Sequence, residues 1–138
     1  MFLSPEYRVY VHDTDVAGVV HHSNYLRYFE AGRIEFLREL GFPYIDFQNQ
    51  GIGFVPVTIH TTYHKPLRQD DTYQVGVVLQ TLKKASFVVH QTILCHNAPY
   101  VEATIKLACV KEPAFKPVGL PKALQGVLGS AVSKIYNE

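Results

Sequence analysis

Hydrophobic and polar residues alternate through most of the second half of the chain. Four segments have a period of two, which is typical of strands with one buried face. They span residues 55–63, 73–79, 87–95 and 101–109. Short stretches rich in Pro, Lys, Asp or Asn separate them, so the pattern predicts four antiparallel strands in series, a meander. Gln91 interrupts the apolar face of the third segment, and the sequence offers no reason for it.

The first half predicts a strand, a loop and one long helix. Residues 6–12 alternate like a strand. From Asn24 to Leu40 the apolar spacing changes to four, seven and four, which predicts an amphipathic helix roughly 25 Å long. Ser23 is a candidate N-cap, and Gly41 and Pro43 predict the end of the helix.

Gly32 lies in the middle of this helix, where glycine costs about 1 kcal/mol relative to alanine. We therefore expect a sheet or a bound ligand to approach closely there. The tail, residues 112–138, holds three prolines and then a short predicted helix over 122–128. One long helix facing one apolar sheet predicts a two-layer α+β domain, in which the twisted sheet curls around the helix.

Composition narrows the functional classes. A chain of 138 residues with 47% hydrophobic residues fits one folded domain, and we expect 1–138 to be that domain. The net charge of +1 gives no reason to expect nucleic acid. Cys95 and Cys109 form no metal or disulfide pattern and predict buried free thiols in a reducing cytoplasm. Neither a signal peptide nor an apolar run long enough to span a membrane is recognisable.

The stretch HDTDVAGVVHHSNY, residues 12–25, is the densest group of polar residues. It begins like a calcium loop, but Ala17 and Asn24 occupy positions that need oxygen ligands. No zinc-binding H-E-x-x-H follows, and adjacent histidines point in different directions on regular backbone. We therefore expect no metal site.

Other common catalytic motifs are also missing: the chain has no G-x-S-x-G elbow, no phosphate loop and no dinucleotide fingerprint. What remains is a carboxylate, Asp13 or Asp15, beside the free amides and positive dipole of a helix N-terminus. Such amides can hold an oxyanion while a carboxylate attacks or activates water. Spacing alone leaves open whether Asp15 does this or only caps a turn around Gly18.

The segment RVYVHDTDVAGVVHHSNYLRYFEAGRIEFLRELG closely resembles hot-dog-fold acyl-CoA thioesterases of the 4-hydroxybenzoyl-CoA thioesterase family, in particular the YbgC-like branch. The signature is D-x-D-x-x-G-V-V, then N-Y, then a helix with Y-x-E-x-x-R. YHKPLRQDD and KKASFVV resemble later family segments, so the resemblance covers about residues 6–110.

The resemblance implies a hot-dog fold, in which a five-stranded antiparallel sheet wraps one central helix. It also implies that two protomers join their sheets into one of ten strands, with active sites at the interface, so we expect a homodimer or homotetramer. Pairing would hide an exposed strand edge. Acyl-CoA is then the substrate, and no separate cofactor is implied.

The same resemblance assigns roles. Asp15 would be the nucleophile or general base, and the backbone N–H of His22 would polarise the thioester carbonyl, with its ring orienting substrate or water. Asp13, Glu30 and Arg33 match structural positions. The expected substrate-binding residues are Gly18, Val19, His21, Tyr25, Lys65, Arg68, Lys83, Lys84 and Ser86, the lysines and arginine as partners of the CoA phosphates.

His21 departs from the family, which often has an aromatic residue there, so no acyl preference carries over. Two other functions remain open. A related hot-dog protein could hydrate or dehydrate acyl thioesters, and a non-catalytic scaffold could bind acyl-CoA without hydrolysing it. The D-x-D-x-x-G loop favours the thioesterase.

Overall fold

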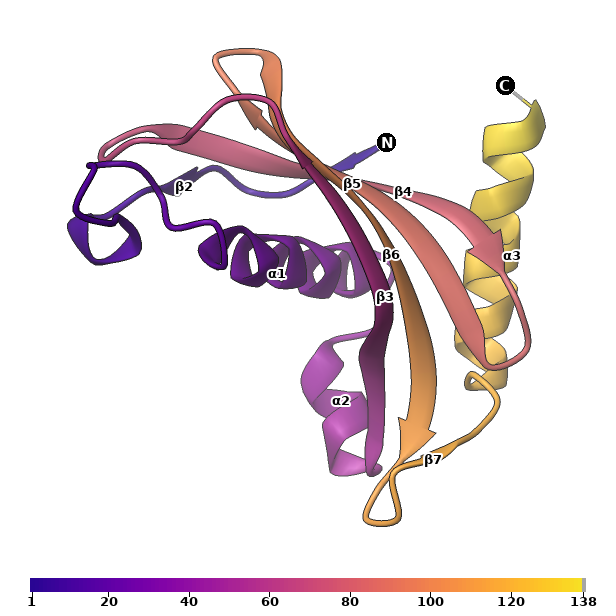
Figure 1. Ribbon diagram of the computed structural model, residues 1–138. Helices are drawn as coiled ribbons and strands as arrows, with labels where there is room; N and C mark the ends of the chain where they lie inside the picture. Colours follow the sequence, from indigo (N-terminus) through magenta and orange to yellow (C-terminus); the bar gives the residue numbers. More distant parts are fainter. Residues whose placement is uncertain (138) are drawn as a thin grey trace.

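The computed structural model describes the backbone of residues 1–137 and the side chains of residues 1–131 (Figure 1). Its helices are η1 (Val11–Asp13, a 3-10 turn), α1 (Asn24–Glu39), α2 (Tyr44–Asn49) and α3 (Lys122–Asn137). Its strands are β1 (Phe2–Leu3), β2 (Tyr7–Arg8), β3 (Ile52–Tyr63), β4 (Thr72–Leu82), β5 (Ser86–Cys95), β6 (Ala98–Lys111) and β7 (Lys116–Pro117).

One antiparallel sheet forms the body of the fold, in the order β1-β4-β5-β6-β3. The short strands β2 and β7 pair with β4 and β6. The sheet curves strongly, and α1 lies in its hollow (Figure 1). This confirms the predicted α+β class and the hot-dog arrangement, because α1 supplies the apolar face that the inner side of the sheet covers.

The predicted meander is wrong in one respect, the place of β3. This strand pairs with β6 from Ile52↔Lys111 to Tyr63↔Val101 and so forms the edge opposite to β1. It does not pair with β4, its neighbour in sequence, because the N-terminal strands β1 and β2 occupy the free side of β4. The chain crosses between the two edges over residues 64–71.

The predicted strand over residues 6–12 is also shorter than expected. Two-residue strands lie on either side of Pro5, and the chain then turns into η1. The N–H of Thr14 donates to the carbonyl of Val11, and the Asp13 carboxylate accepts the N–H of Tyr10. These local bonds replace a strand ladder, and alternation of side chains could not reveal them.

The predicted ends of α1 are confirmed, whereas the predicted end of the tail helix needs correction. Ser23 is the N-cap residue of α1, but its side chain makes no capping hydrogen bond, because its hydroxyl contacts the ring of His21 instead. The helix ends at Glu39, and Gly41 follows with φ +96°. The tail helix extends over Lys122–Asn137 rather than 122–128. Leu124 and Leu128 are completely buried, and α3 packs against β4, so this helix belongs to the core.

The buried polar residue Gln91 has a structural role. Its amide nitrogen donates to the carbonyl of Phe29 at 2.8 Å, and its amide oxygen accepts the guanidinium of Arg33 at 3.1 Å. Because both partners are on α1, Gln91 joins β5 to the helix. Cys95 and Cys109 are free and buried, as predicted.

Gly32 is where the sheet approaches α1, so the sheet, not a ligand, explains it. A Cβ built at Gly32 would lie only 2.7 Å from the Cβ of Val75, a distance that real structures avoid. Val75 is fully buried and β-branched, so it cannot move aside easily.

Gly32→Ala is therefore expected to destabilise the protein by about 1–3 kcal/mol through overpacking, despite the better helix propensity of alanine. Gly126→Ala on α3 is the matched control, because a Cβ there meets nothing within 4 Å. Urea unfolding measures both. Equal stability of Gly32→Ala and the unmodified protein would show that the helix is not held this close to the sheet.

Candidate active site

The loop that carries Asp15 is a tight hairpin. The Asp15 N–H donates to the carbonyl of Val19 at 2.9 Å, and the Gly18 N–H donates to the carbonyl of Asp15 at 3.0 Å. Gly18 has φ +80°, a conformation that favours glycine. The Asp15 carboxylate also caps this turn, since its Oδ1 accepts the N–H of Ala17 at 2.8 Å. The side chain is exposed to solvent.

The hairpin is fixed to the crossing segment before β4. The Val20 N–H donates to the carbonyl of Leu67 at 2.8 Å, and Val19 forms an antiparallel bridge with Arg68. The Leu67 N–H donates to the buried hydroxyl of Tyr25 at 3.0 Å. Residues 65–68 and the first turn of α1 therefore lie beside the Asp15 loop.

Asp13 holds the start of α1 in place. Its carbonyl accepts the N–H of His21 and the side-chain amide of Asn24, and its buried carboxylate accepts the guanidinium of Arg27 at 2.9 Å. Burial alone raises the pKa of Asp13, but the bonds from the Tyr10 N–H and from Arg27 outweigh it, so the pKa lies below its usual value. These contacts support a structural role.

Asp13→Asn is expected to cost about 1.5–3 kcal/mol at neutral pH, because it removes a charge-assisted hydrogen bond from a buried site. A lowered folded-state pKa means that the stability from Asp13 is present above the unfolded pKa of about 4 and is lost as pH falls through the folded pKa. The difference in the free energy of unfolding between Asp13→Asn and the unmodified protein should therefore become smaller below about pH 4.

Urea unfolding at several pH values measures this difference. Asp70→Asn is the control: Asp70 is exposed with φ 72°, a conformation that asparagine tolerates. A difference for Asp13→Asn that is independent of pH would contradict a charged Asp13 in the folded state.

Some backbone N–H groups at the start of α1 have hydrogen-bond acceptors and others do not. The N–H of His21 donates to the carbonyl of Asp13, that of Ser23 to the His21 ring, and that of Asn24 to the His21 carbonyl. Within residues 1–137, the His22 N–H has no acceptor. It lies at the positive end of a 16-residue helix, where amides bind anions and developing oxyanions. The structure thus leaves free the amide that the resemblance selects.

A hollow of about 260 Å³ opens beside His22. Its lining comes from the loop, the start of α1, the end of β3 and the crossing segment: Val20, His22, Tyr25, Tyr63, His64, Lys65 and Pro66. The volume is close to the lower end for small-molecule sites.

The side chains around the hollow contact one another. The Tyr63 hydroxyl donates to the His22 carbonyl at 3.4 Å, and the His21 and His22 rings stack with their centroids 4.3 Å apart. His64 and Tyr63 are lining residues that the sequence did not single out, although Tyr63 ends a predicted strand and His64 directly precedes Lys65.

The predicted site residues fall into two groups. Those on the loop, the start of α1 and the crossing segment lie together: Asp15, Gly18, Val19, His21, His22, Tyr25, Lys65 and Arg68. Lys83 and Lys84 lie in the turn between β4 and β5, and Ser86 begins β5, so all three are at the other end of β4 (Figure 1). An 11-residue strand separates the groups by roughly 30 Å. One protomer therefore does not bring Lys83, Lys84 or Ser86 to the loop.

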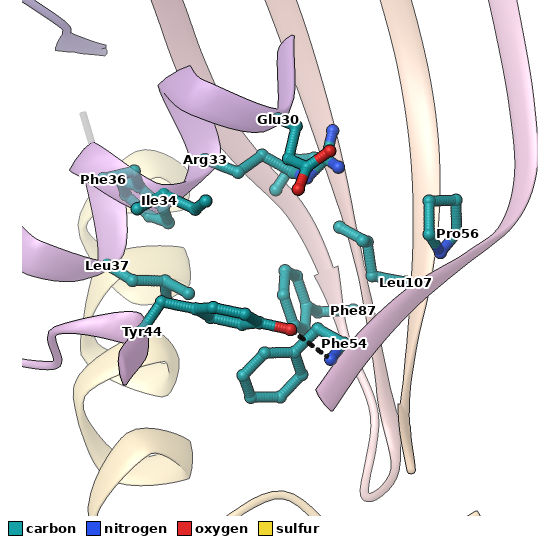
Figure 2. Close-up of a pocket in the computed structure, with 11 residues that line it drawn as sticks. Glu30, Arg33, Ile34, Phe36, Leu37, Tyr44, Phe54, Pro56, Phe87 and Leu107 are labelled. Carbon is teal, nitrogen blue, oxygen red and sulfur yellow. Dashed lines mark hydrogen bonds between the residues drawn. The ribbon is translucent and has the colours of Figure 1, made fainter. Parts of the chain in front are cut away.

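A second cavity lies further along α1, between the helix, α2 and the sheet (Figure 2). Most of its walls are apolar, with Phe54 donating its N–H to the Tyr44 hydroxyl and with Glu30 and Arg33 on the helix side. Its volume of about 110 Å³ is too small for a whole drug-sized ligand. It also begins about two helical turns beyond His22, so it is separate from the hollow at the helix start.

Comparison with known proteins identifies the class. A family model described as the thioesterase-like superfamily matches residues 9–128. The chain is 35% identical to the acyl-CoA thioesterase YbgC of Haemophilus influenzae, over 86% of this chain and 88% of that one. It is 38% identical to a putative esterase of Aquifex aeolicus, over 88% and 93% of the two chains.

Solved structures share the fold, and one of them is described as a probable thioesterase. A hypothetical protein from Aquifex aeolicus matches with a TM-score of 0.86 and 37% identity, covering 93% of this chain and 99% of that one. A probable thioesterase from Bartonella henselae matches with a TM-score of 0.80 and 34% identity, covering 84% and 96%. The chain therefore belongs to the thioesterase-like superfamily. It is an enzyme, a thioester hydrolase. No helix within residues 1–137 is long and apolar enough to cross a membrane.

Proposed function

We propose that this thioesterase hydrolyses acyl-CoA to a free acid and CoA at the Asp15 loop, without a separate cofactor or catalytic metal. The thioester carbonyl oxygen accepts the unused N–H of His22, which stabilises the oxyanion of the tetrahedral intermediate. This free amide at the start of α1 is the observation that carries the proposal. The name of the Haemophilus relative supports CoA as the thiol.

Asp15 supplies the second part of the reaction. Its Oδ1 is held by Ala17, and Oδ2 has no other hydrogen-bond partner in the described chain, so one oxygen is oriented and the other is available. As a nucleophile, Oδ2 attacks the carbonyl carbon, CoA thiolate leaves, and water hydrolyses the resulting anhydride. As a general base, Asp15 takes a proton from water while that water attacks the carbonyl carbon, and the tetrahedral intermediate then expels CoA thiolate and leaves the free acid. The turn-capping contact serves either role, because it fixes the carboxylate.

Substrate binding is proposed for residues around the same loop. Gly18 and Val19 shape the hairpin, Tyr25 and His22 line the hollow, and the His21 ring stacks on that of His22. Lys65 and Arg68 provide the nearby cations for CoA phosphates, since both are exposed on the crossing segment. A role for Lys83, Lys84 and Ser86 in the same reaction would require them to come from another protomer.

We further propose that two protomers join along β3. Among residues 1–137, β3 pairs only on the side of β6, which leaves one edge of a 12-residue strand open. Such edges recruit further strands unless they are blocked. Apolar side chains along it are unusually exposed, with Val57 at 55% and Ile59 at 42%. Pairing of two such edges would give a homodimer, from which a homotetramer could assemble.

A Val57→Lys, Ile59→Lys variant is expected to lower the molar mass in solution to that of one chain, because buried lysines in the interface cannot be solvated. Leu3→Lys is the control, since Leu3 is similarly exposed on the opposite edge of the sheet. Light scattering during gel filtration measures the molar mass of both variants. Loss of the oligomer in Leu3→Lys, with retention in the β3 variant, would place the interface elsewhere.

Product analysis tests the proposed reaction against its alternatives. Incubation with saturated and 2-enoyl-CoA substrates is followed in parallel by a thiol-reactive dye and by the enoyl absorbance. Hydrolysis predicts free thiol in proportion to free acid. A change of enoyl absorbance without thiol would indicate a hydratase or dehydratase, and tight acyl-CoA binding with neither signal would indicate a scaffold protein.

A further inference from the structure

A cluster of potential metal ligands lies outside the hollow, where the turn between β5 and β6 meets the start of β4. It consists of Asp71, Cys95 and His96. Within residues 1–137 this is the only set of three His, Cys, Asp or Glu residues whose ligating atoms all lie within 4.8 Å of one another. The His96 Nε2 is 3.6 Å from the Asp71 Oδ1. Ligands of one tetrahedral ion are separated by distances of this size.

The backbone holds these three groups in position. Asp71 uses its Oδ2 to accept the N–H of Arg68 at 2.8 Å, which leaves Oδ1 for the cluster. Cys95 ends β5 and pairs with Ala98 of β6. His96 follows in a turn with φ 50°, a left-handed conformation that places its ring on the same side as Asp71. A ligand would therefore find the donors already assembled.

The donor types select the class of ion. A thiol, an imidazole and a carboxylate together suit Zn²⁺ and similar borderline ions, whereas Mg²⁺ and Ca²⁺ prefer oxygen alone. Burial raises the pKa of the Cys95 thiol, and the charge of Asp71 raises it further, so the thiol carries its proton when no ion is bound. On binding, the Cys95 proton leaves to solvent, and thiolate and carboxylate together balance the two charges of the ion.

We propose that Asp71, Cys95 and His96 form a binding site for Zn²⁺ or a similar transition-metal ion, with water as the fourth ligand. The ion joins the β5–β6 turn to residues 68–71. It takes no part in the thioester chemistry. The ion influences the candidate active site through Arg68. Asp71 accepts the N–H of Arg68, and Arg68 forms the bridge with Val19 of the Asp15 loop. The sequence alone predicts no metal site, so this proposal differs from that expectation.

The test is direct metal binding to the full chain after removal of metals with a chelator and gel filtration. Zn²⁺ is titrated in competition with a chromophoric indicator, and Co²⁺ is added separately to look for a thiolate-to-cobalt charge-transfer band. The main variant is His96→Asn, since asparagine tolerates the positive φ and the residue is exposed. Cys95→Ser is the second, and thermal unfolding without metal verifies that both fold.

Two control variants address other donors. Cys109→Ser removes the other buried thiol. His90→Asn removes one histidine from another group of polar side chains, in which His90 and His64 both contact the carboxylate of Glu102. Neither should change Zn²⁺ affinity, whereas His96→Asn and Cys95→Ser should each weaken it by about tenfold or more, given that even residues that only orient a ligand contribute about 10–100-fold.

The expected result is one Zn²⁺ per chain, a Co²⁺ charge-transfer band that Cys95→Ser abolishes, and a rise in melting temperature with Zn²⁺ that His96→Asn removes. No stoichiometric binding, unchanged affinity in His96→Asn, or a charge-transfer band that follows Cys109 would overturn the proposal. These readouts do not depend on thioester hydrolysis, so the metal site and the proposed function can fail separately.

Discussion

Asp15→Asn is expected to reduce the rate of acyl-CoA hydrolysis by about 10³-fold or more, equivalent to about 4 kcal/mol in the activation barrier. The amide oxygen of asparagine can still accept the Ala17 N–H, so the turn should remain intact. The amide is neither a nucleophile nor a base at neutral pH. The loss should therefore appear in kcat, with little change in KM or in stability.

Asp46→Asn is a suitable control for this prediction, because Asp46 is an exposed carboxylate on α2, away from the Asp15 loop. It should keep full activity. The two variants are compared by thiol release and by urea unfolding of the same preparations. Near-normal turnover by Asp15→Asn for every acyl-CoA tested would exclude Asp15 as the reacting carboxylate.

His22→Pro is expected to reduce kcat by about 10²–10³-fold, the usual effect of removing one oxyanion donor. His22→Ala should have a much smaller effect, because it removes the ring but keeps the backbone N–H. The contrast between the two variants separates the amide from the imidazole. It follows from the structure, in which the His22 N–H has no acceptor within the described residues.

Circular dichroism and thermal unfolding of both His22 variants verify that α1 still forms, since proline restricts the residue before it. Equal and large losses in His22→Ala and His22→Pro would instead assign the main role to the imidazole ring. Equal activity of His22→Pro and the unmodified enzyme would remove this amide from the mechanism.

The sequence predicted the elements better than their arrangement. Period-two alternation located the four long strands, and the change of period located α1 nearly to the residue. The position of β3 was not predictable in this way, because alternation shows which face of a strand is buried and not which strand lies beside it. The strand predicted over 6–12 was too long, because the bond from the Tyr10 N–H to the Asp13 carboxylate replaces a strand ladder after β2. The two-residue strand β1 was not predicted.

The candidate site shows a similar limit. The two interpretations of Asp15, as turn cap and as reacting group, proved compatible, because one oxygen caps the turn and the other remains available. Lys83, Lys84 and Ser86 were selected by resemblance, and their place at the far end of β4 could not be read from spacing. The Asp71–Cys95–His96 cluster has no sequence motif, since Asp71 and Cys95 are 24 positions apart in the chain and only the sheet brings them together.

The most direct test of the central claim is the rate of free-thiol release from short-chain, long-chain and aromatic acyl-CoA substrates by the purified, unmodified protein. The structure and the comparisons predict hydrolysis of at least one of these classes, with one thiol and one carboxylic acid formed per thioester consumed. The absence of thiol release from every class, under conditions in which acyl-CoA binding is saturated, would contradict the claim.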